Sequence, residues 1–186
     1  MKKFLLFIMM LFCVCATQAQ QTQRDVTKFL GIPIDGFKPQ MRTKLIAKGF
    51  TPAEGQDYLT GEFNGQNVFV RILTNNNKVY RIYLADQDFI DEANIKIRYN
   101  NLVRQFNKNP RYLHLSEYTL PDSEDISYEM LVNKKTYDAV FYQKANLEDE
   151  LSTKRIVWFR ICNSADRYFI GMYYDNVYNQ ADGEDL

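Results

Sequence analysis

The first half of the chain shows one helical pattern followed by three strand patterns. Met41, Leu45 and Ile46 recur at helical spacing within 38–48, and Gly49 fits the position after a helix C-terminus. Alternating segments at 58–63 and 66–73 flank Asn64-Gly65, the dipeptide that supplies both positive φ angles of a type I′ hairpin turn. A third alternating segment follows at 79–84. The pattern predicts a helix and a three-stranded antiparallel meander.

The second half repeats this order of elements. Ile95, Tyr99, Leu102 and Phe106 lie at i, i+4, i+7 and i+11, which predicts an amphipathic helix over 88–107 that ends before Pro110. The strands predicted after this helix cover 126–132, 136–142, 155–161 and 167–174, whereas 112–118 fits either an edge strand or an extended connection.

These patterns predict an α+β fold of two tandem helix-plus-antiparallel-meander units that share one curved sheet, with the helices packed on one face. Aligning Val79 with Ile156 brings the two alternating strands into the same phase, as expected for a duplication. The predicted units cover 20–86 and 87–178, and an acidic tail follows at 179–186.

Alternation also divides the strand residues between two faces of the predicted sheet. The residues expected to face the helices are Tyr80, Ile82, Leu84, Val157, Phe159 and Ile161. The residues expected on the open face, and proposed to bind a partner, are Phe69, Arg71, Arg81, Tyr83, Trp158 and Arg160. Trp, Tyr and Arg dominate binding hot spots, although an ordinary solvated face with Arg–Tyr pairs has the same pattern. Replacing Trp158 and Arg81 by alanine is expected to leave folding nearly intact.

Residues 1–19 have the pattern of a secretory signal. Lys2 and Lys3 precede an apolar run over 4–15, and small residues Ala16 and Ala19 follow. The run is too short to span a bilayer, so cleavage near Ala19 is expected to release a periplasmic or secreted protein without a transmembrane segment. Lipidation is disfavoured because no small residue precedes Cys13 or Cys15.

Charge and the scarcity of reactive side chains reduce the number of function classes that fit the chain. Removing residues 1–19 leaves 21 basic against 23 acidic side chains with no polybasic segment, which argues against nucleic acid as a partner. Cys162 is then the one cysteine, so no internal disulfide forms. His114 is the one histidine, which disfavours triad chemistry and a zinc site. The acidic clusters at 122–125 and 148–150 are expected to be solvated loops, so we expect no enzyme, no cofactor and no metal.

Three segments carry a resemblance to a known family: 29–36 (FLGIPIDG), the helix end 47–50 (AKGF) and the hairpin 58–65 (YLTGEFNG). Together they resemble a family of uncharacterised secreted proteins of Bacteroides-type bacteria. Its helix-then-meander unit is similar to the repeat of the β-lactamase inhibitor protein and of SmpA/OmlA-type outer-membrane lipoproteins. The resemblance implies a shared curved sheet whose open face binds a protein partner. The chain lacks the inhibitor's paired disulfides and the lipoproteins' acylation site, so inhibition of a β-lactamase is not implied.

The expected function is a non-catalytic secreted or periplasmic binding module that docks a protein or cell-envelope component on the open face of its sheet. A structural role in an outer-membrane or envelope assembly is the alternative that the lipoprotein resemblance favours. A carboxylate-dependent hydrolase is a third alternative, because an acid pair can cleave sugars without histidine.

Overall fold

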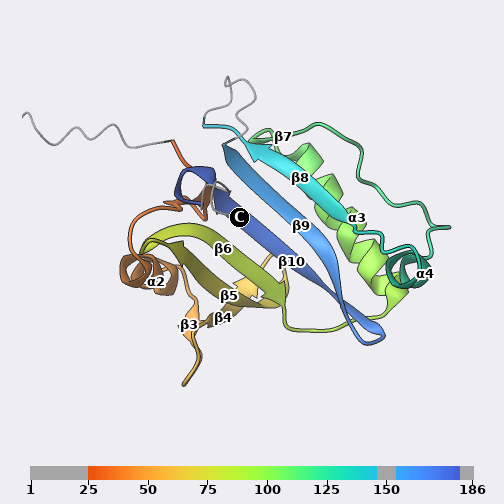
Figure 1. The fold of residues 1–186 in the computed structure, drawn as a ribbon, viewed down its shortest axis with the longest axis horizontal. Coiled ribbons are helices and arrows are strands. Elements are labelled where there is room, and N and C mark those ends of the chain that lie inside the picture. The colour runs from red at the N-terminus through yellow and green to blue at the C-terminus, as the bar shows by residue number, and fades with distance from the viewer. Residues whose placement is uncertain (1–24, 146–153, 181–186) are drawn as a thin grey trace, which may run out of the picture.

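The computed structural model describes residues 25–145 and 154–180 (Figure 1). They form an α+β fold with one large antiparallel sheet and few helices. The predicted signal at 1–19, the acidic cluster at 148–150 and the tail residues 181–186 lie outside the described residues.

The first half follows the predicted order of a helix and a meander. Its elements are β1 (Lys28–Phe29), β2 (Ile32–Pro33), α2 (Lys38–Ile46), β3 (Thr51–Pro52), β4 (Leu59–Phe63), β5 (Gln66–Asn75) and β6 (Lys78–Asp86). The predicted type I′ turn is confirmed, because Asn64 and Gly65 have φ angles of +52° and +72°. Phe50 is buried and its N–H bonds the carbonyl of Leu45, so it folds back onto the last turn of α2.

The second half contains one more helix than the sequence pattern predicts. Its elements are α3 (Glu92–Lys108), β7 (Tyr112–His114), α4 (Ile126–Leu131), β8 (Asp138–Gln143), β9 (Arg155–Ser164), β10 (Arg167–Asn176) and the 3-10 helix η1 (Val177–Asn179). Residues 112–114 form an edge strand, because β7 pairs with β8.

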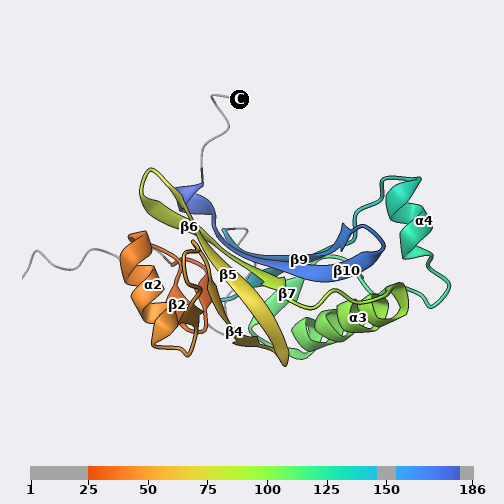
Figure 2. The ribbon, with the colours of Figure 1, turned by 90° about the horizontal axis from the view of Figure 1, so that it is seen from below.

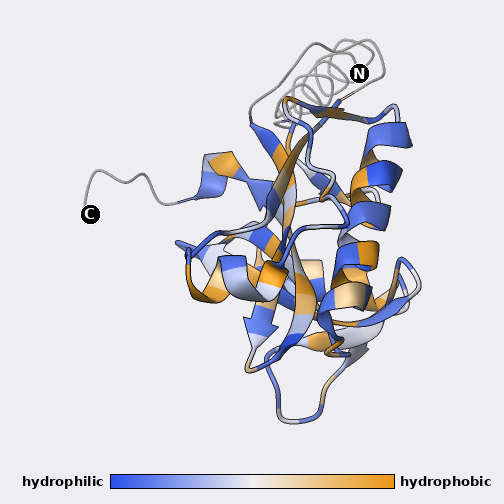
Figure 3. Cartoon of the chain, turned by 90° about the vertical axis from the view of Figure 1, so that its right-hand side faces the viewer, coloured by the Kyte–Doolittle hydropathy of each residue, from blue (hydrophilic) through white to orange (hydrophobic). Residues whose placement is uncertain are grey.

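All of these strands except β1 and β2 join a sheet in the order β3-β4-β5-β6-β10-β9-β8-β7. Every neighbouring pair is antiparallel. In Figure 2 helices α2 and α3 both lie below the curved sheet, and its upper face is left uncovered by them. Figure 3 shows both hydrophobic and hydrophilic residues along the strands, and the alternation of buried and more exposed residues in β5, β6 and β9 assigns them to a covered and an open face.

Helix α3 forms because a cap and an apolar stripe agree. The Asp91 side chain accepts a hydrogen bond of 2.8 Å from the backbone N–H of Asn94, which caps the first turn. The four residues of the predicted stripe, Ile95, Tyr99, Leu102 and Phe106, are all buried. Within the described residues, neither α3 nor any other helix combines the length and the apolar character needed to cross a membrane.

The predicted strand over 126–132 is wrong, because 126–131 form helix α4. The Asp125 side chain accepts a hydrogen bond from the N–H of Tyr128, and Glu92 of α3 accepts one from the N–H of Ile126, each 2.8 Å long. These two carboxylates satisfy backbone donors that have no partner in a first helical turn. Ile126 is the one buried residue of this helix and Met130 packs partly buried against the core, so the alternation in the sequence does not mark a buried strand face.

The predicted inward position of Tyr80 is also wrong, because β6 carries a bulge there. The register of β5 and β6 shifts between Leu73, which pairs with Arg81, and Thr74, which pairs with Val79, so Tyr80 has no opposing residue. Val79 takes the buried position, and Tyr80 lies half-buried next to Arg81. The other five residues expected to face the helices are buried as predicted.

We expect Phe159→Ala to lower the free energy of unfolding by about 3–5 kcal/mol, the usual cost of emptying a buried aromatic position. The Phe159 side chain is fully buried, and its ring centroid lies within 5.3–5.9 Å of those of Tyr99, Phe106 and Phe141. Urea titration measures the change. The control is Ile97→Ala on the exposed side of α3, which is expected to change stability by less than about 0.5 kcal/mol. Equal losses in the two variants would contradict this core assignment.

Candidate binding face

The uncovered face of the sheet faces the viewer in Figure 1, in front of α3. The six residues expected there alternate with buried residues along β5, β6 and β9, and they therefore share this face: Phe69, Arg71, Arg81, Tyr83, Trp158 and Arg160. The structure thus brings together all six candidate binding residues.

A single row of side chains crosses five neighbouring strands on this face. The strand register places Arg71 of β5 opposite Tyr83 of β6, then Tyr173 of β10, Trp158 of β9 and Val140 of β8. We call these five residues the central row. None of them is fully buried, so the row offers a continuous, mostly aromatic surface.

The rings of the central row pack tightly against one another. Trp158 and Tyr173 stack with 3.8 Å between centroids and 8° between planes. Tyr83 lies on the other side of Tyr173, with 4.8 Å between centroids. Burial, followed by the proximity of the Tyr173 phenol, raises the pKa of Tyr83 well above its ordinary value. Burial is also the largest cause that raises the pKa of Tyr173, so both phenols stay neutral across the physiological range.

Asp175 organises the charged part of the face. The guanidinium group of Arg81 donates to both of its carboxylate oxygens, at 2.6 and 2.7 Å, and Trp158 Nε1 donates a third hydrogen bond of 2.9 Å. The Asp175 side chain is only 5% exposed, against 24% for Arg81. The hydrogen bond to Asp175 raises the pKa of Arg81. Arg81 and Trp158 therefore hold a buried carboxylate, and replacing both by alanine is expected to destabilise the fold, contrary to the expectation from the sequence.

The remaining two arginines of the face differ in how they are held. Arg160 donates a 2.7 Å hydrogen bond to Asp138, and its guanidinium carbon lies 5.2 Å from the Trp158 ring centroid. Arg71 is exposed and forms no ion pair with any described residue. Arg71 is therefore the cation that a partner can reach without displacing an internal carboxylate.

Several residues of the face were not identified from the sequence: Asp138, Cys162, Gly171, Tyr173 and Asp175. Alternation along 167–174 could have identified Tyr173, but the neighbour relation between β6 and β10 has no local signal. A Cβ at Gly171 would lie 3.2 Å from Cys162 Sγ and 3.3 Å from the Tyr173 hydroxyl, so glycine gives these side chains room. Cys162 is half-buried, and burial raises the pKa of its thiol, which disfavours a reactive thiolate.

The other candidate chemistry lies away from this face. Exposed His114 on β7 directs its Nδ1 to the carbonyl oxygen of Ser116, at 3.1 Å. Across residues 25–145 and 154–180, no three side chains of metal-ligating type gather in one place.

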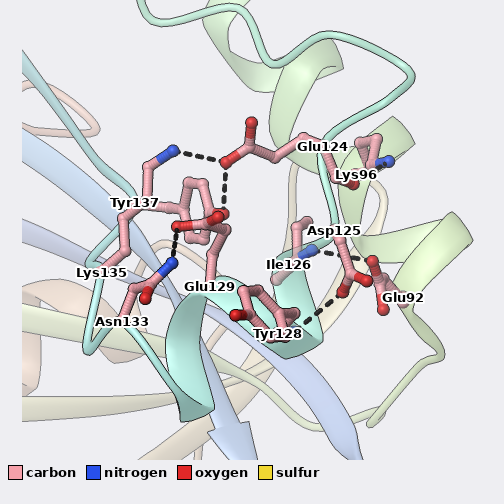
Figure 4. Close-up of polar contacts among 10 residues, drawn as sticks. All are labelled: Glu92, Lys96, Glu124, Asp125, Ile126, Tyr128, Glu129, Asn133, Lys135 and Tyr137. Atoms are coloured by element: carbon pink, nitrogen blue, oxygen red, sulfur yellow. Dashed lines mark hydrogen bonds and ion pairs between the residues drawn. The ribbon is translucent and has the colours of Figure 1, made fainter.

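The acidic cluster at 122–125 is a connection between α3, α4 and β8 (Figure 4). Glu124 accepts a 2.6 Å hydrogen bond from the Tyr137 hydroxyl and pairs with Lys135, while Lys96 of α3 binds the carbonyl oxygens of Asp122 and Glu124. The hydrogen bonds from Lys135 and then Tyr137 lower the pKa of Glu124. Glu124 is thus a structural carboxylate and not an isolated acid in a cleft.

We expect Arg81→Ala to cost about 3 kcal/mol of stability, because it leaves Asp175 buried without its ion pair. Arg160→Ala removes a pair whose members are 37% and 29% exposed, so it is expected to cost no more than about 1 kcal/mol. Replacing both partners of this pair, with Arg81→Met and Asp175→Leu, is expected to cost less than Arg81→Ala alone. Chemical denaturation measures all three variants, and equal losses for Arg81→Ala and Arg160→Ala would contradict this ranking.

The lowered pKa of Glu124 makes its contribution to stability depend on pH. The unfolded chain binds this proton more tightly, so the stabilisation is complete above the ordinary pKa of 4.5 and is lost as the pH falls through the lowered folded value. Glu124→Gln is therefore expected to destabilise at pH 7 and to differ less from the wild type as the solution becomes more acidic. Unfolding titrations from neutral to acidic pH test this, with Glu54→Gln at an exposed site as the control. A difference that grows on acidification would contradict the assignment.

Comparison with known proteins gives no relative from which a role of this face could be inferred. No family model, curated protein or solved structure matches the chain.

Proposed function

We propose that the protein is a non-catalytic binding module that docks a protein or cell-envelope component on the open face of its sheet. The observation that carries the proposal is the central row, which crosses five strands on a face that α2 and α3 leave uncovered. Residues 1–19 retain the pattern of a cleaved secretory signal, so the proposed place of action is the periplasm or the extracellular space.

The rigidity of the row supports binding. Trp158 is fixed by its stack on Tyr173 and by its hydrogen bond to Asp175, and Tyr173 is fixed on its other side by Tyr83. Side chains that are already ordered lose little conformational entropy when a partner docks. Large aromatic rings with this pre-organisation are typical of binding hot spots.

The charges of the face favour one contact point for an acidic group. The guanidinium groups of Arg81 and Arg160 are paired with Asp175 and Asp138, whereas Arg71 at the end of the row is unpaired among the described residues. Phe69 lies on the same strand, two residues away, with its ring edge-to-face against Tyr58 at 5.0 Å. A partner that places an apolar or aromatic group on the rings and an acid on Arg71 fits this arrangement.

We also infer that the two halves are tandem units. A helix followed by the strands β3 to β6 has its counterpart in α3 followed by β7 to β10, and the last strands of the two sets, β6 and β10, lie side by side. This correspondence matches β6 with β10 instead of the β6 to β9 alignment expected from Val79 and Ile156. The change follows from α4, which takes the place of a predicted strand.

The test uses Arg71→Glu to disturb binding without disturbing Asp175. Tagged wild type and variant are used to capture partners from envelope and culture-supernatant fractions, and any captured component is purified and titrated. Trp158 is the single tryptophan of the chain, so its fluorescence reports on the central row. We expect Arg71→Glu to weaken binding about tenfold or more, as for the loss of a charge-assisted contact.

The matched control is Arg104→Glu, the same charge change at an exposed position of α3 on the covered side. It is expected to bind as the wild type does. A partner that binds Arg71→Glu with undiminished affinity and leaves the Trp158 fluorescence unchanged would contradict the proposed face.

A further inference from the structure

A second surface lies on the covered side of the sheet, between the region of α2 and the C-terminal end of α3. It is an open cleft of about 850 Å³. One wall comes from β1, the turn that follows α2 and the end of β4, and the other from α3, β7 and the end of β8. This volume is within the range of small-molecule sites, which is about 300–1,000 Å³.

The lining of the cleft carries an excess of positive charge. It contains four basic residues, Lys28, Lys48, Arg111 and Lys144, but Glu62 as its one acidic residue. Lys28, Lys48 and Arg111 are exposed, and their side chains form no ion pair with a described residue. The dipole of α3 places a partial negative charge of about half an elementary charge at its C-terminal end, which is smaller than the positive charge of the basic residues. The net field of the cleft therefore favours an anion.

The floor of the cleft is apolar. Phe50, Phe106 and Met172 are buried side chains that line it, and Tyr174 lies beside them on β10. Phe50 is held in place because it packs directly on Gly61, where a Cβ would come within 2.6 Å of its ring. Aromatic rings and a methionine thioether form an adaptable surface for an aliphatic or aromatic body.

Two polar side chains, Gln143 and Tyr112, also line the cleft. The Gln143 side-chain amide donates 3.1 Å to the Tyr112 hydroxyl and bonds both backbone groups of Lys28, at 2.7 and 3.0 Å. Tyr112 thus acts as acceptor toward Gln143, and its hydroxyl also hydrogen-bonds with the hydroxyl of Tyr174. Burial raises the pKa of Tyr112, so the phenol stays neutral. The same glutamine fixes the backbone of Lys28 at the rim.

We propose that this cleft binds an anionic amphiphile of the fatty-carboxylate type. The apolar chain lies on Phe50, Phe106 and Met172, and the carboxylate lies toward Lys28 and Arg111. The site is on the opposite side of the sheet from the central row, so it is independent of the function proposed for that face.

Isothermal titration of the purified protein with decanoate tests the proposal. Decanol has the same chain without the charge, and decyltrimethylammonium has the opposite charge, so both are expected to bind about tenfold or more weaker than decanoate. Raising the salt concentration is expected to weaken the binding of decanoate, because exposed cations are screened.

Two variants locate the ligand. Arg111→Glu is expected to weaken decanoate binding about tenfold or more by reversing one rim charge. Gln105→Phe places a ring in the cleft from an exposed position of α3, so it is expected to block binding without removing any core contact. Lys44→Glu is the control, because Lys44 is exposed on α2 and does not line the cleft. Thermal melts confirm that each variant is folded.

Three results would overturn the proposal. The first is no heat of binding with decanoate up to about 1 mM, the weak end of specific affinity. The second is decanol binding as tightly as decanoate, which would leave the cationic rim without a role. The third is unchanged affinity in both Arg111→Glu and Gln105→Phe, which would place the ligand elsewhere on the protein.

Discussion

The pairing of β6 with β10 is the contact on which the whole sheet depends. It joins the strands β3 to β6 to the strands β7 to β10, and no other pair among the described strands connects these two groups. A carboxylate reinforces each end of this pairing. Asp175 of β10 binds the Arg81 guanidinium across it, and Asp86 of β6 accepts a hydrogen bond of 3.2 Å from the N–H of Ile170 while it is held by Arg98 of α3. Both aspartates are buried, so each depends on its arginine.

Most of the local structure could be predicted because it has local causes. The turn at Asn64-Gly65 needs two positive φ angles, and the dipeptide itself supplies them. Helix α3 needs an apolar stripe, and the residues of that stripe all lie within the helix. The helix α4 could not be predicted in the same way. It depends on Glu92, which lies 34 residues before Ile126 in the chain, and on the Lys96 and Glu124 contacts that hold the connection to α3. The bulge at Tyr80 likewise depends on the register with β5.

The same distinction applies to the candidate binding face. Alternation alone placed the six proposed residues on one side of the sheet, because a strand directs successive side chains to opposite faces. It could not place Tyr173 and Asp175 next to them, since β6 and β10 are nearly ninety residues apart and meet only through the fold. The contacts with Asp175 change the role assigned to Arg81 and Trp158 from partner binding to stability. They stabilise a buried carboxylate, which leaves Arg71 and the ring surfaces as the groups open to a partner.

The position of β10 has a consequence for how the chain reaches its native state. Among the described strands, the one that joins the two groups, β10, comes last along the chain, so the sheet does not close until the residues up to Asn176 are available. Until then β6 and β9 each expose a free edge, and such edges template pairing between molecules. When β10 docks between β6 and β9, it therefore completes the sheet and removes both of these edges in one step.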